Sequence, residues 1–561
     1  MKFNVLDQIG EWNPQLFREL KGRLKPRNLA IASAMSIFGQ ILLYLYYESL
    51  LPVHQKYNRY CGGSAKPKWS NYSSGNCIHD QLGNLIIFKQ LWWLDMFIGM
   101  SIIGIFALLV AGTYMLITDL SKEERHGTLN FIRLSPQSAR SILLGKILGV
   151  PILLYFVTLL ALPLHLGAGL AAQIPLGLIL TFYVVLAASC AFFYSVALLY
   201  GLVSSGLIGF QALLGSGSVL FFLFLMTVTT INGNVPKGTT VDWFTLFYPG
   251  TVLPYLVNAT HIPYRTVGYF NIKDLADWLW YGQPLWTKAS LGIGFLLLNY
   301  GLWTYWISQG LKRRFHNPLA TILSKQQSYW LTGSFLLISV GFALQSSRSY
   351  SLFENFAYLQ FLILILFLGL IAILSPHRQA LQDWARYRHQ NQKNRKRHSL
   401  IKDLIWGEKS PSTVAIALNL GIMTFYLLPV ILVSPLENYK IPVLLGVVVS
   451  VSIILIYAAI AQLMLLMKTR KPSIWAAATV GTLIIFPIAN FGLFQISPSD
   501  APWMWLFSLL PIVATEDALG ATVFFSMVVQ WLTIALLGFQ MNKKLQQAGK
   551  SATKALLSRQ S

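Results

Sequence analysis

The stretch of sequence that decides the fold runs from Leu176 to Met226 and reads LGLILTFYVVLAASCAFFYSVALLYGLVSSGLIGFQALLGSGSVLFFLFLM. It contains no Asp, Glu, Lys or Arg, and it is long enough for two membrane-spanning helices of about 20 residues each. Its apolar residues are continuous and lack the two-residue alternation of a transmembrane β-strand. The stretch therefore predicts a pair of transmembrane helices.

The rest of the chain has the same character. Of its 561 residues, 55% are apolar and 11% are charged, whereas soluble domains carry about 25% charged residues. This composition excludes soluble enzymes and disordered proteins, and it predicts an all-α polytopic membrane protein with about 12 transmembrane helices. We expect the spans at 28–50, 91–117, 142–165, 176–200, 206–231, 288–308, 329–346, 353–374, 412–434, 441–467, 473–496 and 518–540.

The net charge of +23 is explained by membrane topology. If the N-terminus is cytoplasmic, 32 of the 43 Lys and Arg residues lie in or beside cytoplasmic segments and 11 lie in or beside outer ones. Such an excess is the usual sign of a cytoplasmic loop. We therefore expect both termini in the cytoplasm, the lipid bilayer as the surrounding partner, and no nucleic-acid ligand.

Short repeated sequences indicate that the chain contains an internal repeat, with six helices in each copy. Four pairs recur in the same order: Asn13-Pro14 with Asn317-Pro318, Ser135-Pro136 with Ser410-Pro411, Trp243-x-x-Leu246-Phe247 with Trp503-x-x-Leu506-Phe507, and Ala320-Thr321 with Ala552-Thr553. Because Asn is a good N-cap and Pro a good first helical residue, both Asn-Pro pairs predict helix starts. The alternative is that twelve unrelated helices share common helix-start dipeptides by chance.

This repeat gives the expected organisation of the chain. An N-terminal interfacial helix (1–27) has Leu16, Phe17, Leu20 and Leu24 on one face. It is followed by a first six-helix membrane half (28–310), an interfacial helix or linker (311–328), a second six-helix half (329–540) and a cytoplasmic basic tail (541–561). The two halves are expected to form a pseudo-dimer, with a homo-oligomer as the alternative.

The loop after the second span is the strongest functional candidate. It reads DLSKEERHGTLNFIRLSP from Asp119 to Pro136. We expect Thr128 to cap a short helix and Gly127 to permit a backbone reversal before it. An apolar knob on that helix, flanked by charges, suits insertion into a groove on a cytoplasmic partner. The candidate residues are Glu123, Glu124, Arg125, Gly127, Thr128, Leu129, Ile132 and Leu134.

The run Glu-Glu-Arg-x-Gly-Thr-Leu, followed by Leu-Ser-Pro and Gly145-Lys146, resembles the membrane subunits of ATP-binding-cassette exporters of the type-2 permease class. The resemblance covers residues 12 to about 310. It implies that the loop is a coupling helix that docks on a separate ATPase subunit, and that short helices dip into the outer leaflet around Trp243. It also implies a multi-pass protein of the bacterial plasma (inner) membrane.

The second half departs from this pattern. Its equivalent loop, from Ser375 to Arg388, lacks the Glu-Arg-x-Gly-Thr sequence, and a basic run follows from Lys393 to Arg397. Either this half docks a partner differently or it only completes the membrane domain. The chain also has no Gly-x-x-x-x-Gly-Lys-Ser/Thr motif. We therefore expect a permease that is not an enzyme and has no cofactor of its own, with ATP used by the partner subunit.

Two other classes compete with an exporter. A cation-coupled secondary transporter usually buries a carboxylate near the bilayer centre, whereas the acidic residues here lie at predicted span ends. A membrane-embedded transferase or protease would need a catalytic constellation. The nine histidines are scattered, and His165 is better explained as a hydrogen-bonded packing residue. We keep the secondary transporter as the alternative.

Three cysteines are too few for a disulfide framework. Cys61 and Cys77 lie in the same expected outer loop, where conditions are oxidising. We predict a disulfide between them, with two free thiols as the alternative. Cys190 is expected to be a buried thiol within the fourth span.

Overall fold

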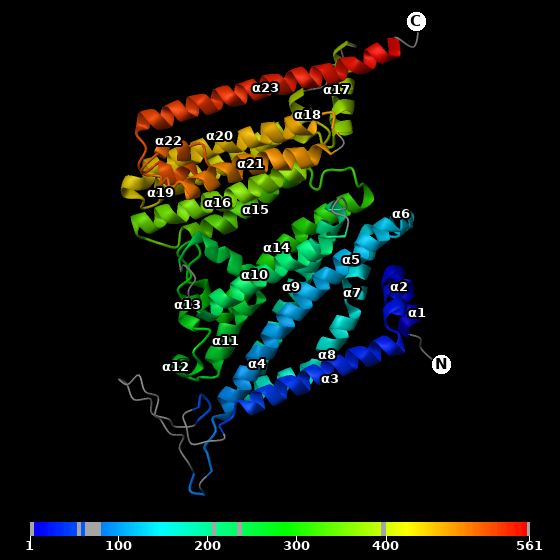
Figure 1. Ribbon diagram of the computed structural model, residues 1–561, viewed down its shortest axis with the longest axis vertical. Coiled ribbons are helices and arrows are strands. Elements are labelled where there is room, and N and C mark those ends of the chain that lie inside the picture. The colour runs from blue at the N-terminus through cyan, green and yellow to red at the C-terminus, as the bar shows by residue number, and fades with distance from the viewer. Residues whose placement is uncertain are drawn as a thin grey trace. The chain divides into compact units, whose positions relative to one another are not determined.

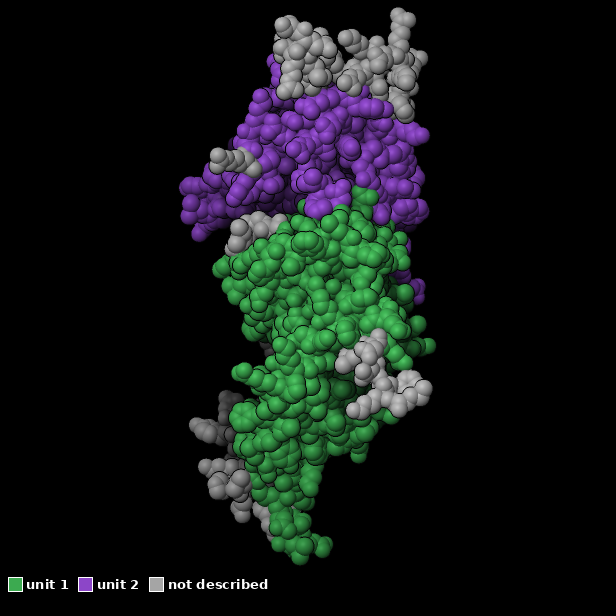
Figure 2. Space-filling model, turned by 90° about the vertical axis from the view of Figure 1, so that its right-hand side faces the viewer, with its two compact units in different colours: residues 1–237, 244–278, 284–316 green, residues 238–243, 279–283, 317–561 purple. Residues whose placement is uncertain are grey.

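The structure is a computed structural model, and it describes residues 5–52, 58–61, 80–82, 84–204, 209–232, 238–393, 400–469 and 471–557. Within these ranges the chain is built from helices (Figure 1). It divides into two compact units, which are coloured separately in Figure 2: unit 1 comprises residues 1–237, 244–278 and 284–316, and unit 2 comprises 238–243, 279–283 and 317–561.

Unit 1 contains the elements from α1 to α14. The long ones are α3 (Pro26–Ser49), α4 (Lys89–Phe106), η1 (Ala107–Ala111), α5 (Gly112–Arg125), α7 (Ala139–Gly149), α8 (Ile152–Ala171), α9 (Leu176–Val203), α10 (Gln211–Asn232) and α14 (Ala289–His316). The short ones are α1 (Val5–Trp12), α2 (Pro14–Arg23), α6 (Thr128–Leu134), η3 (Pro249–Val252), α11 (Leu253–Ala259), α12 (Tyr264–Val267), α13 (Ile272–Ala276) and η4 (Leu285–Thr287).

The helices of unit 1 pack side by side. Helix α9 packs on α5 and α14, α8 packs on α3 and α4, and α10 packs on α5. Helices α1, α2 and α6 lie at one end of these helices, and α11, α12 and α13 lie at the other (Figure 1). We call these the α6 end and the α11 end of unit 1.

Unit 2 contains the elements from α15 to α23. They are α15 (Lys325–Ala343), α16 (Ser349–Leu374), α17 (Arg378–Lys393), α18 (Leu400–Trp406), α19 (Thr413–Val433), η5 (Glu437–Tyr439), α20 (Lys440–Leu465), α21 (Pro472–Leu493), α22 (Pro502–Trp505), η6 (Pro511–Ala514) and α23 (Gly520–Leu557). Helix α20 is central, since it packs on α16, α19, α21 and α23. The 3-10 helix η2 (Thr240–Phe247) begins in unit 2 and ends in unit 1.

The expected class, a polytopic helical membrane protein, is confirmed. Among the described residues, ten helices are long and apolar enough to cross a membrane. Each of the twelve expected spans overlaps at least one helix, but α14 and α15 are not among those ten. Both carry several polar and aromatic side chains, such as Asn299 and Trp303 in α14 and Gln326 and Gln327 in α15. The count of twelve spans is therefore not confirmed.

Two local expectations were wrong. Asn317-Pro318 begins a turn, in which Asn317 Oδ1 accepts the Leu319 N–H at 3.0 Å. The helix starts only at Lys325, because Ser324 and Gln327 form a capping box there. The third span is broken at Val150-Pro151, since proline lacks the N–H that a helix interior needs. Helix α23 continues beyond the expected last span to Leu557, so residues 541–557 of the expected tail are helical.

Candidate functional site

The predicted coupling loop is a sharp turn between two helices. Gly127 has φ +71°, so the predicted backbone reversal is confirmed, and its N–H donates to the Glu124 carbonyl at 3.1 Å. The expectation that Thr128 is the N-cap was wrong. Gly127 occupies the cap position, and Thr128 is the first residue of α6. Its hydroxyl instead donates to the Glu123 carbonyl at 3.1 Å, which ties the new helix back to α5.

Helix α6 has one buried and one exposed apolar face. Leu129 is 1% exposed and Ile132 is 9% exposed, whereas Phe131 is 77% and Leu134 is 83% exposed. We expected Leu129, Ile132 and Leu134 to form one apolar surface, and this was wrong. Residues three apart share a helix face, so Leu129 pairs with Ile132 and Phe131 pairs with Leu134. The exposed apolar surface is therefore Phe131 with Leu134, which we call the α6 knob.

The remaining flank of α6 contacts the end of α14. The Arg133 guanidinium lies 5.9 Å from the centre of the Phe315 ring and donates to Asn130 Oδ1 at 3.1 Å. Burial lowers the pKa of Arg133, and Glu124 partly offsets this effect. Glu124 and Arg125 themselves are exposed at the end of α5.

A buried ion cluster lies beside the turn. Lys146 on α7 is fully buried, with its Nζ 2.7 Å from Asp119 Oδ2, 2.7 Å from Glu123 Oε2 and 3.9 Å from Glu19 Oε1. Asp119 and Glu123 are on α5, and Glu19 is on α2. Burying a lysine ammonium is costly unless charged or hydrogen-bonding partners such as these surround it. Lys146 therefore joins three helices at one point.

Two arginines complete the cluster at its edge. Arg23 contacts Asp119 at 2.6 Å and Glu19 at 3.2 Å, and Arg18 contacts Glu19 at 3.3 Å and also pairs with Glu123. Burial alone would lower the pKa of Arg18, but Glu123 and Glu19 raise it overall above its usual value. Three positive and three negative side chains thus balance.

The three carboxylates are close enough to one another to suggest a metal site. Oxygen atoms of Glu19, Asp119 and Glu123 lie within 4.8 Å of one another. The Lys146 ammonium, however, already contacts all three, and together with Arg18 and Arg23 it balances their charge. The geometry therefore favours a structural ion cluster over a metal centre.

The predicted interfacial helix is docked on this cluster. Asn13 caps α2 as expected, because its Oδ1 accepts the Leu16 N–H at 3.0 Å. Its Nδ2 also donates to the Ser141 carbonyl at 2.8 Å. A side chain at Gly149 would place its Cβ 2.5 Å from Glu19 Cβ. Helices α2 and α7 can therefore approach this closely only because residue 149 has no side chain. Leu16 and Leu20 are buried by the protein, so α2 does not rest on the membrane alone.

Sequence reasoning missed five members of the cluster. Asp119 and Glu123 are four residues apart on α5, as are Glu19 and Arg23 on α2. Side chains at this spacing share a helix face, and two acidic side chains on one face repel each other. A positively charged side chain placed between them removes this repulsion. That signal was present in the sequence. The members missed are Arg18, Glu19, Arg23, Asp119 and, as a charge, Lys146.

The predicted disulfide falls partly outside the described residues. Cys61 is buried and forms an isolated antiparallel bridge with Ile87, whereas Cys77 lies outside the described residues. Cys61 is disulfide-bonded, as predicted, and the identity of its partner as Cys77 stays a prediction. Cys190 is a buried free thiol in α9, as expected. His165 is also buried among hydrogen-bond partners.

No family model, curated protein or solved structure matched this chain. What the site does is therefore inferred from its own residues and contacts.

Proposed function

We propose that the chain is the permease component of an ATP-dependent exporter, and that α6 couples it to a separate ATPase subunit. The observation that carries the proposal is the α6 knob, Phe131 and Leu134, exposed on a short helix whose opposite face, Leu129 and Ile132, is buried. Two exposed apolar side chains on a helix that is packed against the protein can insert into an apolar groove on a partner protein. The resemblance of the loop sequence to type-2 permeases supports the same reading.

The anchoring gives the knob a route to the membrane helices. Helices α4, η1 and α5 form one helical rod of 37 residues, about 55 Å long at 1.5 Å per residue. The hydrocarbon core is about 30 Å thick, so this rod projects well beyond it and holds α6 in water. The ion cluster links the projecting part of the rod to α2 and α7. A push on α6 is therefore passed to several helices together.

In this proposal twelve helices in two halves form the transmembrane pathway, with α14 and α15 as the sixth and seventh spans. The α6 end and both termini are cytoplasmic, in the plasma membrane of a bacterium. The echo around Trp243 and Trp503 supports the repeat, since both tryptophans lie in short helices, η2 and α22, after a long apolar helix. The second Asn-Pro pair departs from the repeat, because Asn317-Pro318 begins a turn whereas Asn13-Pro14 begins a helix.

The alternative, a cation-coupled secondary transporter, would use a carboxylate that is available to bind a cation. Asp95, near the α11 end of α4, is instead engaged. Arg59 contacts it at 2.8 and 3.0 Å, and the hydroxyls of Tyr60 and Tyr269 donate to it. The carboxylates around Lys146 are likewise paired. Neither cluster favours the alternative.

The test is co-purification from the native host. We expect the tagged chain to retain a protein that contains a Gly-x-x-x-x-Gly-Lys-Ser/Thr loop, and the complex to hydrolyse ATP. Leu134→Asp and Phe131→Asp place a charge in the desolvated contact, which costs several kcal/mol and lowers recovery of the ATPase at least about tenfold. Both residues face water in the isolated chain, so the melting temperature of the permease should hold.

The matched control is Leu82→Asp. Leu82 is 86% exposed and lies in the connection between α3 and α4, at the α11 end. The same charge there should leave ATPase recovery unchanged. Normal recovery with Leu134→Asp and Phe131→Asp would remove the coupling role of α6. Recovery of no ATPase, together with transport that follows a proton or sodium gradient, would favour the secondary transporter.

A further inference from the structure

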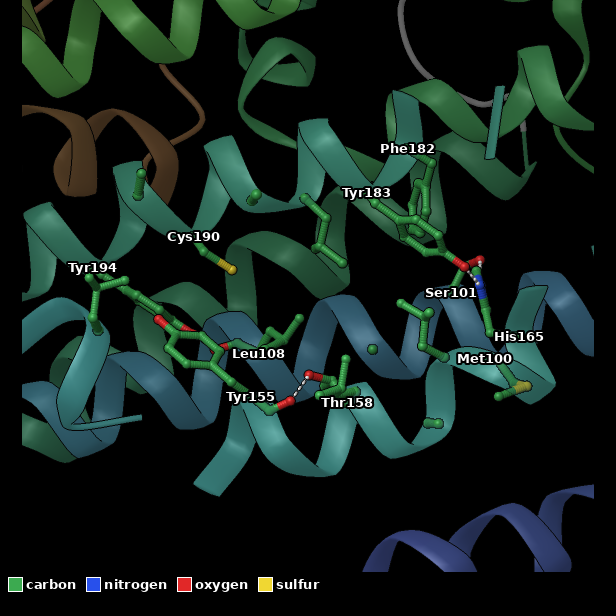
Figure 3. A pocket seen from close by; sticks show the side chains of 18 of the residues that line it. Met100, Ser101, Leu108, Tyr155, Thr158, His165, Phe182, Tyr183, Cys190 and Tyr194 are labelled. Atoms are coloured by element: carbon green, nitrogen blue, oxygen red, sulfur yellow. Dashed lines mark hydrogen bonds between the residues drawn. The ribbon is translucent and has the colours of Figure 1, made fainter. Parts of the chain in front are cut away.

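Unit 1 contains a cavity of about 460 Å³ between its long helices. Its walls come from α4, η1, α7, α8 and α9 and are mostly apolar, with Met100, Leu108 and Phe182 among them (Figure 3). Cavities of about 300–1,000 Å³ with apolar walls and a few polar groups are typical ligand sites. No contact of the coupling site uses this cavity, which we call the α8–α9 groove.

One end of the groove carries a chain of hydrogen bonds. Ser101 Oγ donates to the Phe97 carbonyl at 2.8 Å and lies 2.9 Å from His165 Nε2. Because a serine has one hydroxyl proton, Nε2 must carry the proton and donate to Ser101. His165 Nδ1 then accepts from the Tyr183 hydroxyl at 2.7 Å. Tyr183 Oη keeps free acceptor capacity at the groove wall, where the side chain is half-exposed.

At the other end of the groove the tyrosine hydroxyl protons are used within the protein. The Tyr194 hydroxyl donates to the Leu108 carbonyl at 2.7 Å, and the Tyr155 hydroxyl donates to the Ile147 carbonyl at 2.9 Å. Leu108 lies in the π-helical turn η1. Gly112, just after this turn, leaves room for Tyr194, since a Cβ there would lie 2.2 Å from its hydroxyl. This end therefore offers a ligand no tyrosine hydroxyl proton, and the fully buried Tyr194 is closed to it.

The groove opens sideways. Leu148, Leu159 and Leu162 line it, yet they are 41%, 63% and 36% exposed at the surface of the unit. Leu159 and Leu162 belong to α8, a helix long and apolar enough to cross a membrane. Exposed leucines on such a helix face lipid, so a molecule dissolved in the bilayer reaches the groove without crossing water.

The length of the groove matches a single lipid chain. On α9 its wall runs from Phe182 to Tyr194, which is about 18 Å at 1.5 Å per residue. One leaflet of the hydrocarbon core is about 15 Å thick. A ligand with its head at Tyr183 and its tail at Tyr194 would fill this length.

We infer that the α8–α9 groove binds a single-chain lipid with a hydroxyl-bearing head group, of the monoacylglycerol type. The acyl chain lies along α8 and α9, and a head-group hydroxyl donates to Tyr183 Oη. A charged head group fits poorly, because the polar end of the groove provides no ionic partner among its described lining residues. This inference does not depend on the coupling role of α6.

The test uses the full chain in phosphatidylcholine nanodiscs and a monoacylglycerol with a diazirine in its acyl chain. Light should crosslink it to peptides within 152–203, and excess 1-oleoylglycerol should lower the yield at least about fivefold. Gly104→Phe should lower the yield equally, because Gly104 lines the groove and its Cβ would meet open space. Gly39→Phe on α3 is the matched control, since Gly39 also meets nothing within 4 Å and lies outside the groove.

Tyr183→Phe tests the head-group contact. Loss of one hydrogen bond, about 0.5–1.5 kcal/mol, should raise the half-saturating probe concentration about threefold to tenfold. A diazirine fatty-acid methyl ester, which has no hydroxyl, should bind parent and variant equally.

Equal crosslinking of Gly104→Phe and Gly39→Phe would overturn the groove as the site. An unchanged half-saturation in Tyr183→Phe would overturn the head-group assignment, and equally strong competition by added phosphatidylcholine would overturn the single-chain class. Should Gly104→Phe fail to fold, Ala187→Phe fills the groove from α9, where Ala187 lines it and is exposed.

Discussion

Two buried lysines, one in each unit, satisfy the same chemical need in different ways. Lys146 in unit 1 contacts three carboxylates. Lys325 in unit 2 donates to the Leu404 carbonyl at 2.7 Å, to Ser410 Oγ at 2.6 Å and to the Pro411 carbonyl at 3.1 Å. Both ammonium groups hold a short helix against a long one, α2 in unit 1 and α18 in unit 2. The first is an ion cluster and the second is a cap made of neutral acceptors.

The difference indicates where each unit holds its helices in a fixed arrangement and can transmit force between them. An ion cluster is strong only while every member is present, and it fixes several helices in one arrangement. A neutral cap satisfies the last carbonyls of α18 and the chain before α19, and it fixes one junction. In unit 1 the cluster lies beside the α6 knob. Under the proposed function, this is where a bound ATPase subunit would push on the permease. Unit 2 has no such pairing among the contacts described for Lys325.

The largest expected effect is that of Lys146→Met. It leaves Glu19, Asp119 and Glu123 with only the two arginines at the edge of the cluster, and an uncompensated buried charge costs about 3–5 kcal/mol. The free energy of unfolding, measured by titrating mixed micelles with sodium dodecyl sulfate, should fall by about this amount. Lys122→Met is the control, because Lys122 is exposed on α5, and it should change little.

The double variant Lys146→Met/Asp119→Asn sharpens the comparison. It leaves two carboxylates and two guanidinium groups, so charge balance returns. We expect it to unfold at a higher detergent fraction than Lys146→Met alone, with a coupling energy of about 1–3 kcal/mol. If the two substitutions are simply additive, Lys146 and Asp119 do not act as a pair, and the contrast with unit 2 is lost.

Lys325→Met should have a smaller effect that depends on pH. Burial lowers the pKa of Lys325 to about 8, partly opposed by Asp403, whereas an unfolded lysine has a pKa of about 10.4. Between these pH values the unfolded chain binds more protons, so the stability of the parent rises with pH. The variant lacks this gain.

The loss of stability in Lys325→Met is therefore expected to be about 1 kcal/mol at pH 7 and to widen by about 1–3 kcal/mol near pH 10. Comparing unfolding of parent and variant at both pH values cancels the titration of other groups. Lys409→Met, at an exposed site close to Ser410, should show no such widening. A loss that shrinks with rising pH would contradict the assigned pKa.

The sequence predicted the helices better than it predicted the contacts between them. Apolar runs located the ten helices that are long and apolar enough to cross a membrane, because an apolar stretch of that length has few alternatives. The backbone reversal at Gly127 also followed from local chemistry. The faces of α6 did not, since Leu129 and Leu134 are equally apolar and only the packing of α6 shows which one is buried. The ion cluster required Glu19 and Lys146, far apart in sequence, to meet.

The smallest expected effect, that of Gly127→Asn, comes from a comparison of two glycines at the helix ends beside these lysines. Gly127 has φ +71° and nothing within 4 Å of an added Cβ, so its requirement is conformational. Gly407, after α18, is not among the positive-φ glycines, but an added Cβ would lie 2.4 Å from the Asp403 carbonyl oxygen. Its requirement is steric.

Asparagine separates the two requirements, because it adopts a left-handed conformation more readily than other side chains. Gly127→Asn should cost a few tenths of a kcal/mol, roughly the smallest change among these variants, whereas Gly127→Val should cost about 1–2 kcal/mol. At position 407 both Asn and Ala should cost about 1–3 kcal/mol, because either Cβ displaces backbone that holds the acceptors of Lys325. Detergent titration of the four variants measures these differences. If Gly127→Asn is as harmful as Gly127→Val, the turn before α6 is limited by space, and the two junctions are alike after all.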